Sequence, residues 1–301
     1  MLQCLCVKSK QRSNNLRVLR ALRGKLILAV TLLFYLSLTA AEPLNRHLRM
    51  GYTLRNTSNE LIQQSDFYVR VPLAQTPWQS CSNITASVPF ETVNEPDGGQ
   101  IIHFCLTDLL PFASRVIWID VDVEMQQRDF EKMNREQLLK CEGLFQADDI
   151  AFQKELRRLK HRVLNPAELP NSINSRVHQI VKMTAYSSKN RGAAFALKTG
   201  KGDCSEQMAL ATALCRLSAI PAIGVSGVRT FRNRVMHPSD YHDWSAVYAN
   251  RKWSIADPLY NYYNSDGSNY IAFEWIYGTE LPDSYLRRYK VSNSNIKVRM
   301  E

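Results

Sequence analysis

Alternating apolar and polar positions dominate the chain between residues 45 and 125. Four segments have the period of two that places successive side chains on opposite faces of a strand. These segments are residues 48–55, 66–72, 100–106 and 115–121. Turn-forming residues separate them, including Asn56-Thr57-Ser58-Asn59 and the run from Glu95 to Gly99. Several short strands at this spacing predict a β-sandwich domain over residues 42–125.

After residue 125 the apolar positions recur with helical spacing. Three helices are predicted between residues 126 and 190, the first capped by Asp129 and the second by Asp148. Their apolar positions are Phe130, Met133, Leu138 and Leu139, then Ile150, Phe152, Leu156, Leu159 and Val163, then Ile173, Val177, Ile180 and Val181. Residues 204–217 are apolar nearly all round, which is typical of a buried helix. Residues 269–277 predict another core strand, and the fold class is therefore α+β.

The start of the buried helix offers candidate chemistry. Asp203 is a suitable N-cap, and Glu206 three residues later completes a capping-box pattern, which places Cys204 at the first helical position. A cysteine there lies beside free backbone N–H groups and the positive end of the helix dipole. Both favour the thiolate, which is the nucleophilic form. Gly200 and Gly202 are expected to let the backbone approach a substrate closely.

A β-hairpin is predicted to supply the partners of this cysteine. Residues 242–248 and 251–257 both alternate, and Ala249-Asn250 between them is the expected two-residue turn. That turn places His242 directly opposite Asp257, with Cβ atoms about 4.5–5.5 Å apart. A slip of one residue would place the two side chains on opposite faces. Cys204, His242 and Asp257 are thus candidate nucleophile, base and orienting carboxylate.

Several ordered motifs carry a resemblance to a known family. They are Gly192-Ala193-Ala194-Phe195-Ala196-Leu197, Gly200-Lys201-Gly202-Asp203-Cys204, Ala213-Leu214-Cys215-Arg216, Ile220-Pro221-Ala222, His242-x-Trp244 and Trp253-x-x-x-Asp257-Pro258. Residues 173–275 resemble the core of the transglutaminase-like superfamily, of the bacterial envelope type. The resemblance implies a papain-like core, a buried helix packed on an antiparallel sheet, within a domain of residues 126–301 that includes a helical cover. It also implies a catalytic triad of Cys204, His242 and Asp257.

Two positions depart from the family pattern. Ala219 stands where the family usually has Gly before Ile-Pro-Ala, and a non-Gly residue in left-handed geometry there costs on the order of 1 kcal/mol. Ile223 stands where the family often has Arg after Pro-Ala, so any role of that charge is lost. Neither departure touches the three candidate catalytic side chains.

The resemblance implies thiol-dependent acyl transfer or hydrolysis at a protein or peptide amide, and it implies no cofactor. Because the same triad serves both reactions, water (peptidase or amidase) and an amine (cross-linker) remain open as acyl acceptors. The backbone N–H of Cys204 is one expected oxyanion donor, and Tyr186 and Trp244 are candidates for the second. Two alternatives remain: a catalytically silent binding or scaffold module, in which Cys204 is a structural thiol, and a structural envelope protein whose β domain carries the function.

Charge and hydropathy indicate membrane targeting. The formal net charge is +10, but residues 1–25 hold seven basic residues and no acidic ones, and the rest has 31 basic against 28 acidic residues. A nucleic-acid partner is therefore not predicted. The apolar run of residues 26–41 behind the basic segment predicts a signal peptide or membrane anchor, with the body outside the cytoplasm. A buried N-terminal helix is the alternative for this run.

The remaining cysteines and histidines give weaker signals. Cys81 and Cys105 are a candidate disulfide pair in an oxidising compartment. Cys141 and Cys215 are expected to be small core residues. No metal site is predicted, because the cysteines lack C-x-x-C spacing and His237, Asp240 and His242 alone are weak ligand evidence.

Overall fold

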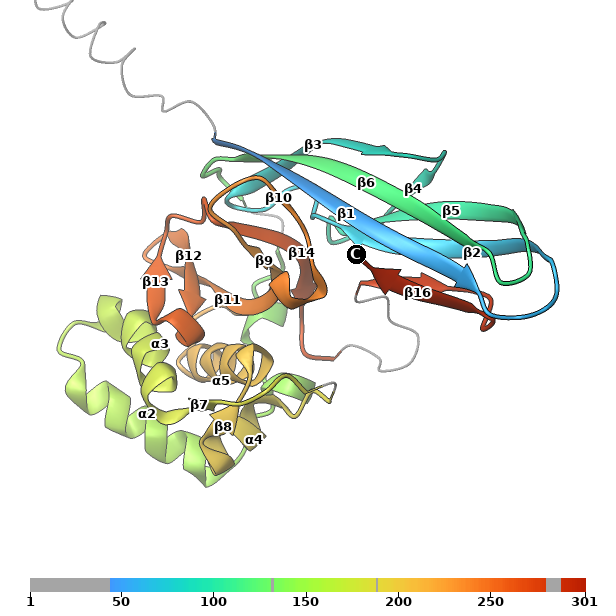
Figure 1. The fold of residues 1–301 in the computed structure, drawn as a ribbon. Coiled ribbons are helices and arrows are strands. Elements are labelled where there is room, and N and C mark those ends of the chain that lie inside the picture. The colour runs from blue at the N-terminus through green and yellow to red at the C-terminus, as the bar shows by residue number, and fades with distance from the viewer. Residues whose placement is uncertain (1–43, 131–132, 188, 280–287) are drawn as a thin grey trace, which may run out of the picture. The chain divides into compact units, whose positions relative to one another are not determined.

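The computed structural model describes residues 44–130, 133–187, 189–279 and 288–301. Residues 44–301 form one compact unit. The fold is mixed α+β, with more strand than helix (Figure 1). The predicted membrane-targeting segment, residues 26–41, lies outside the described residues. Among the residues that are described, no helix has the length and apolar character needed to span a membrane.

The N-terminal half forms two facing sheets. The first contains β1 (Leu44–Asn56), β6 (Ser114–Met125), β3 (Gln79–Ala86), β16 (Ile296–Met300) and β10 (Arg234–Val235). The second contains β2 (Ile62–Val71), β5 (Gln100–Leu109), β4 (Glu91–Asn94) and β15 (Tyr289–Val291). The four predicted strands are confirmed as β1, β2, β5 and β6, whereas β3 and β4 had no clear alternation to predict them.

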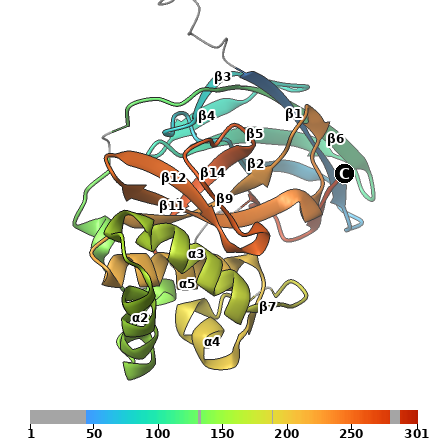
Figure 2. The same cartoon turned by 90° about the vertical axis from the view of Figure 1, so that its left-hand side faces the viewer.

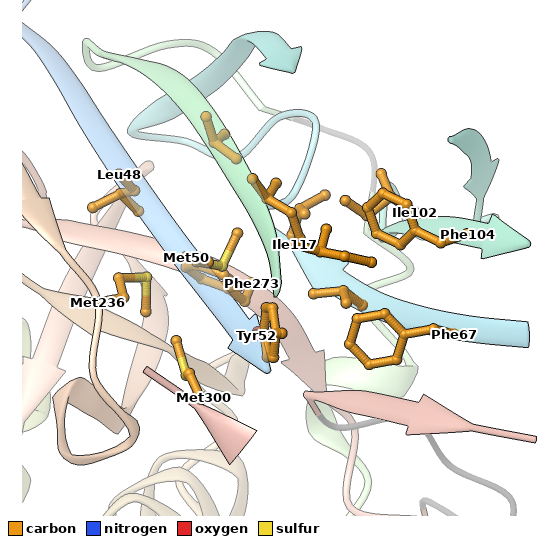
Figure 3. Close-up of a cluster of buried hydrophobic side chains, with 14 of the residues drawn as sticks. Leu48, Met50, Tyr52, Phe67, Ile102, Phe104, Ile117, Met236, Phe273 and Met300 are labelled. Atoms are coloured by element: carbon orange, nitrogen blue, oxygen red, sulfur yellow. The ribbon is translucent and has the colours of Figure 1, made fainter. Parts of the chain in front are cut away.

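Later segments of the chain complete both sheets. β16 pairs with β1, β15 pairs with β2, and β10 pairs in parallel with Leu48 and Arg49 of β1. The apolar core between the sheets also takes in side chains from beyond residue 125, including Met236, Phe273 and Met300, in the same cluster as Tyr52 (Figure 3). The division into domains at residue 125 stays a prediction.

The C-terminal half is built on an antiparallel sheet covered by helices on one face. Its strands, in spatial order, are β13 (Tyr262–Asn264), β12 (Lys252–Asp257), β11 (Tyr241–Ala249), β9 (Ala222–Arg229) and β14 (Tyr270–Ile276). The helices are α2 (Ile150–Arg162), α3 (Leu169–Ile180), α4 (Gly192–Thr199) and α5 (Cys204–Leu217). α5 packs directly on β9 and β11, and α3 and α4 pack against α5 (Figure 2). As predicted, α5 is a buried helix.

Two expectations about the helical cover are wrong. The helix expected from Asp129 is only a short 3-10 turn at Gln137–Leu139. The Phe130 carbonyl accepts a hydrogen bond from the Trp253 indole at 3.2 Å, and Phe130, Met133 and Leu138 pack onto the β9–β14 sheet from an irregular chain. In α2 the N-cap is Asp149, whose carboxylate accepts from Ala151 N, and not Asp148.

Candidate active site

Hydrogen bonds among adjacent residues fix Cys204 at the start of α5. The Asp203 side chain accepts from Ser205 N at 2.9 Å, and Glu206 Oε2 accepts from Asp203 N at 2.9 Å, so the predicted capping box is confirmed. Arg191 holds the Glu206 carboxylate from outside, with Nη2 to Oε2 at 2.8 Å. Cys204 is the first residue of the helix, as expected, and its side chain is half-buried.

The two glycines before Cys204 have structural roles, and the close approach of a substrate predicted for them stays a prediction. A Cβ on Gly202 would lie 2.5 Å from Glu206 Cβ, so Gly202 is needed for the capping box to close. Gly200 ends α4 in the left-handed conformation, with φ of 62°. Packing and helix termination explain both glycines, with no substrate required.

The electrostatic surroundings of the Cys204 thiol do not favour the thiolate. The pKa of Cys204 is raised to about 12, mainly by burial and next by the charge of the Asp243 carboxylate, while a hydrogen bond from the Asp243 backbone N–H opposes the shift. Asp243 is itself buried and accepts a hydrogen bond from Ser205 Oγ at 2.6 Å. The expected effect of the helix start is therefore outweighed, and the resting side chain is the neutral thiol.

The β11–β12 hairpin has a different register from the predicted one. Its turn is Asn250-Arg251, with φ of 53° and 62°, so that Ala249 pairs with Lys252 and Tyr248 with Trp253. The predicted turn was one residue too early, and each β11 residue meets a partner two positions further along β12. A shift of two preserves the face on which a side chain lies, because strand side chains alternate.

His242 and Asp257 consequently meet diagonally and not directly across the hairpin. His242 Nε2 lies 2.7 Å from Asp257 Oδ2, and Asp257 is fully buried. Since Nε2 is engaged by the carboxylate, Nδ1 is the ring nitrogen left to face a thiol. The contact predicted from the alternation is present, although the register used to predict it is wrong.

Tyr270, on the first position of β14, is a further residue of this network. Its hydroxyl donates to the same Asp257 Oδ2 at 3.0 Å. Burial, followed by the charge of Asp257, raises the pKa of the Tyr270 hydroxyl, which keeps it a donor. The sequence predicted the strand that carries Tyr270 but gave no signal for this bond, because the two residues meet only when β14 joins the sheet.

Cys204 and His242 line one cavity of about 640 Å³. Cys204 also lines a second cavity of about 630 Å³, whose walls include Ser205 and Asp243. Within the described part of the chain, no hydrogen bond joins the Cys204 sulfur to the His242 ring; such bonds often tighten only when substrate binds. The structure thus places the three predicted residues around one site and joins two of them directly.

The two candidates for the second oxyanion donor lie in different surroundings. Tyr186 lines both cavities and is 66 % exposed. Trp244 is buried beside His242, with ring centroids 6.0 Å apart, and its indole nitrogen has no hydrogen-bond partner among the described residues. The identity of the second donor stays a prediction.

The structure does not bring the candidate disulfide cysteines together, and it gives His237 and Asp240 a structural role. Cys81 lies on β3 and Cys105 on β5, in different sheets, and both are free. His237 and Asp240 cap a 3-10 turn, and Asp240 pairs with Arg234 at 2.8 Å. In the described ranges, no group of three or more His, Cys, Asp and Glu side chains is placed to hold a metal ion.

Comparisons with known proteins agree with this architecture. Residues 156–258 match the family model described as "Transglutaminase-like superfamily". A structure described as "a Putative Cysteine Protease from Cytophaga hutchinsonii" is 17 % identical, with a TM-score of 0.60 over 87 % of this chain and 91 % of that one, and it shares the fold. The periplasmic domain of TgpA from Pseudomonas aeruginosa is 15 % identical, with a TM-score of 0.38 over 74 % of this chain and 89 % of that one. A search of curated proteins found no match.

Proposed function

We propose that this chain, whose residues 156–258 form a domain of the transglutaminase-like superfamily, is a thiol-dependent acyltransferase or amide hydrolase. The observation that carries the proposal is the His242–Asp257 pair, at 2.7 Å, on the cavity that Cys204 also lines. A cysteine at a helix start, facing an imidazole oriented by a carboxylate, is the arrangement of covalent acyl transfer.

In the proposed mechanism, Cys204 Sγ attacks the carbonyl carbon of a peptide or side-chain amide. His242 takes the thiol proton as the C–S bond forms, and it gives that proton to the nitrogen of the departing amine as the C–N bond breaks. Water or a second amine then attacks the thioester, with His242 accepting its proton and returning it to the sulfur. Asp257 orients the imidazole and does not itself take the proton. The Cys204 N–H donates to the oxyanion.

The raised pKa of Cys204 decides which form of this mechanism applies. With a pKa of about 12, the resting enzyme holds a neutral thiol and not a preformed ion pair. His242 therefore acts as a general base during attack, as an imidazole does for a serine hydroxyl. At mildly acidic pH, Cys204 in the proposed enzyme should therefore not react with alkylating reagents. The enzyme should still convert a bound substrate, because His242 takes the thiol proton during the attack.

The location proposed for the body is outside the cytoplasm. It rests on the basic segment of residues 1–25 followed by the apolar run of residues 26–41, which is typical of a signal peptide or anchor. Protease protection in membrane vesicles tests it, because a body exposed only after vesicle rupture lies on the far side of the membrane.

The activity is tested by incubating the full chain with a peptide library and reading the products by mass spectrometry. New N-termini indicate peptide hydrolysis, conversion of Gln to Glu indicates side-chain hydrolysis, and Gln–Lys linkages indicate transfer to an amine. All products should disappear in Cys204→Ala. The matched control is Cys105→Ala, which removes an exposed thiol on a different sheet. Products that persist in Cys204→Ala would overturn the proposal.

A second candidate is a silent binding module on the same core. The observation that favours it is the half-buried Cys204, whose pKa is raised by burial and which makes no hydrogen bond to His242 among the described residues. Under this alternative the library experiment gives no Cys204-dependent product, although peptides still bind in the cavity.

A further inference from the structure

Arg229 places an arginine guanidinium at the edge of the candidate site. It is the last residue of β9, and it lines the cavity shared by Cys204 and His242. Its guanidinium carbon lies 4.1 Å from the Tyr260 ring centroid, and the Tyr260 ring lies 5.4 Å from the His242 ring. One aromatic ring therefore separates this cation from the proposed base.

The charges around the cavity do not neutralise Arg229. Among the described residues, three arginines line it, Arg229, Arg234 and Arg288, against two carboxylates, Asp203 and Asp240. Asp240 pairs with Arg234 at 2.8 Å, and Asp203 is occupied in capping α5. In the described part of the chain, no carboxylate pairs with Arg229, and its buried Nε has no hydrogen-bond partner. The cavity therefore has an uncompensated positive charge close to its reactive groups.

The surroundings of Arg229 hold the guanidinium in one orientation. Phe231 and Tyr260 both lie against it, at 4.8 and 4.1 Å, and Tyr270 lies at 5.7 Å. An aromatic ring covers the flat face of a guanidinium and leaves the N–H edge available, and that edge matches the two oxygens of a carboxylate. Tyr260 also lines the cavity and is more than half exposed, so it provides apolar surface beside the guanidinium.

From this arrangement we propose that Arg229 is an anion subsite, which binds a carboxylate of the substrate next to the amide that Cys204 attacks. The substrate class is an acidic peptide. This inference rests on the proposed function for the reaction, but the binding it describes does not require turnover. The carboxylate is either an Asp or Glu side chain or the free C-terminus of a peptide, and both present the same pair of oxygens.

The experiment measures binding of labelled peptides to the full chain in detergent, with Cys204→Ala to prevent turnover. Three hexapeptides of Ala and Gln are compared: one with a single Glu and an amidated C-terminus, one with a free C-terminus and no Glu, and one neutral at both positions. We expect at least one of the two peptides that carry a carboxylate to bind more tightly than the neutral peptide. Adding Arg229→Gln should weaken that binding about tenfold and leave the neutral peptide unchanged, because a charge-assisted hydrogen bond is lost.

Two further variants separate recognition from folding. Arg229→Lys keeps the charge and should retain part of the preference for the acidic peptide. Arg232→Gln is the matched control, since Arg232 is exposed, lies three residues away and does not line the cavity. A structural role alone predicts a lower melting temperature for Arg229→Gln with an unchanged ratio of acidic to neutral binding.

Equal affinity for the three peptides, or no measurable binding of any of them, would overturn the anion subsite. Neither result bears on the reaction, because the library experiment reads Cys204-dependent products separately. Conversely, if the library experiment gives no Cys204-dependent product, the comparison of peptide affinities still tests the anion subsite.

Discussion

The start of α5 and the β11–β12 hairpin supply the two halves of the proposed site, and they hold their side chains in different ways. At the helix start, Asp203, Ser205 and Glu206 bond to one another within four consecutive residues. In the hairpin, His242 and Asp257 meet only because a turn folds two strands together. A local hydrogen-bond pattern can be derived from residue types, whereas a strand register depends on backbone geometry at the turn.

The largest expected effect comes from breaking the hairpin pair. Asp257→Asn should lower Cys204-dependent product formation about 10³–10⁴-fold, because an amide does not fix the same imidazole tautomer. Initial rates on the substrate identified by the library experiment give the measurement. Asp240→Asn is the control, since Asp240 lines the same cavity but pairs with Arg234. Similar losses in both variants would mean that the cavity needs negative charge and not an oriented histidine.

A second test joins the two regions through Asp243 on β11, which accepts from Ser205 on α5. Asp243→Asn removes a charge that raises the pKa of Cys204, so the thiolate fraction at a given pH should increase. We expect alkylation of Cys204 by iodoacetamide to become on the order of tenfold faster, about one pKa unit.

The same assay tests the pKa of the parent protein. Because that pKa is about 12, the alkylation rate should rise about tenfold per pH unit from pH 7 to pH 10, without a plateau. A plateau below pH 8 would show that the thiolate forms readily, and it would restore the ion-pair mechanism.

A third change weakens the helix start. Asp203→Ala removes the N-cap and exposes unpaired N–H groups, so the free energy of unfolding should fall by about 1–2 kcal/mol. Urea denaturation measures this loss. Asp149→Ala, at the N-cap of α2, is the matched control for a cap remote from Cys204. Equal losses of stability, with a slower reaction only in Asp203→Ala, would show that the cap also positions the cysteine.

The hairpin turn offers a smaller effect of opposite sign. Arg251 has φ of 62°, where a side chain is strained, and Asn-Gly is the favoured pair for this turn. Arg251→Gly should stabilise the protein by about 1 kcal/mol and raise the melting temperature by about 2–4 °C. Scanning calorimetry gives the shift. A lower melting temperature would mean that contacts of the Arg251 side chain outweigh the strain.

The C-terminal end of α5 provides the smallest test. Ala219 has φ of 58° and closes the helix, with Ile220 N bonded to Cys215 O at 3.0 Å. Ala219→Gly relieves this strain, but glycine loses more entropy on folding, so the net gain should be at most about 1 kcal/mol. Thermal unfolding of the single variant measures this gain.

The sequence was informative wherever a few neighbouring residues determine the structure. The cap at Asp203, the buried helix and the four long strands follow from local patterns and are confirmed. The hairpin turn was misplaced because Arg251 is not a residue type that signals left-handed geometry. In the described part of the segment expected to form a helix after Asp129, only the 3-10 turn at Gln137–Leu139 forms, and its apolar residues pack onto a sheet made of later strands.

The parts of the candidate site that escaped prediction all depend on distant segments. Tyr270 reaches Asp257 only through the pairing of β14 with β9, and Arg229 lies near His242 only because the Tyr260 ring, which follows β12, lies between them. The raised pKa of Cys204 likewise comes from burial and from Asp243 on another strand. These contacts and this pKa shift exist only in the assembled tertiary structure, so they cannot be predicted from the spacing of residues in the sequence.

The return of β15 and β16 to the first two sheets has a consequence for the order of folding. β1 and β6, which pair along one edge of β1, lie within residues 44–125, whereas part of the opposite edge stays open until the distant β16 joins it. Contacts between such distant segments form slowly, and an open strand edge can pair with another chain in the interval. We therefore expect refolding to be slow and sensitive to protein concentration, with the N-terminal sheets completed last.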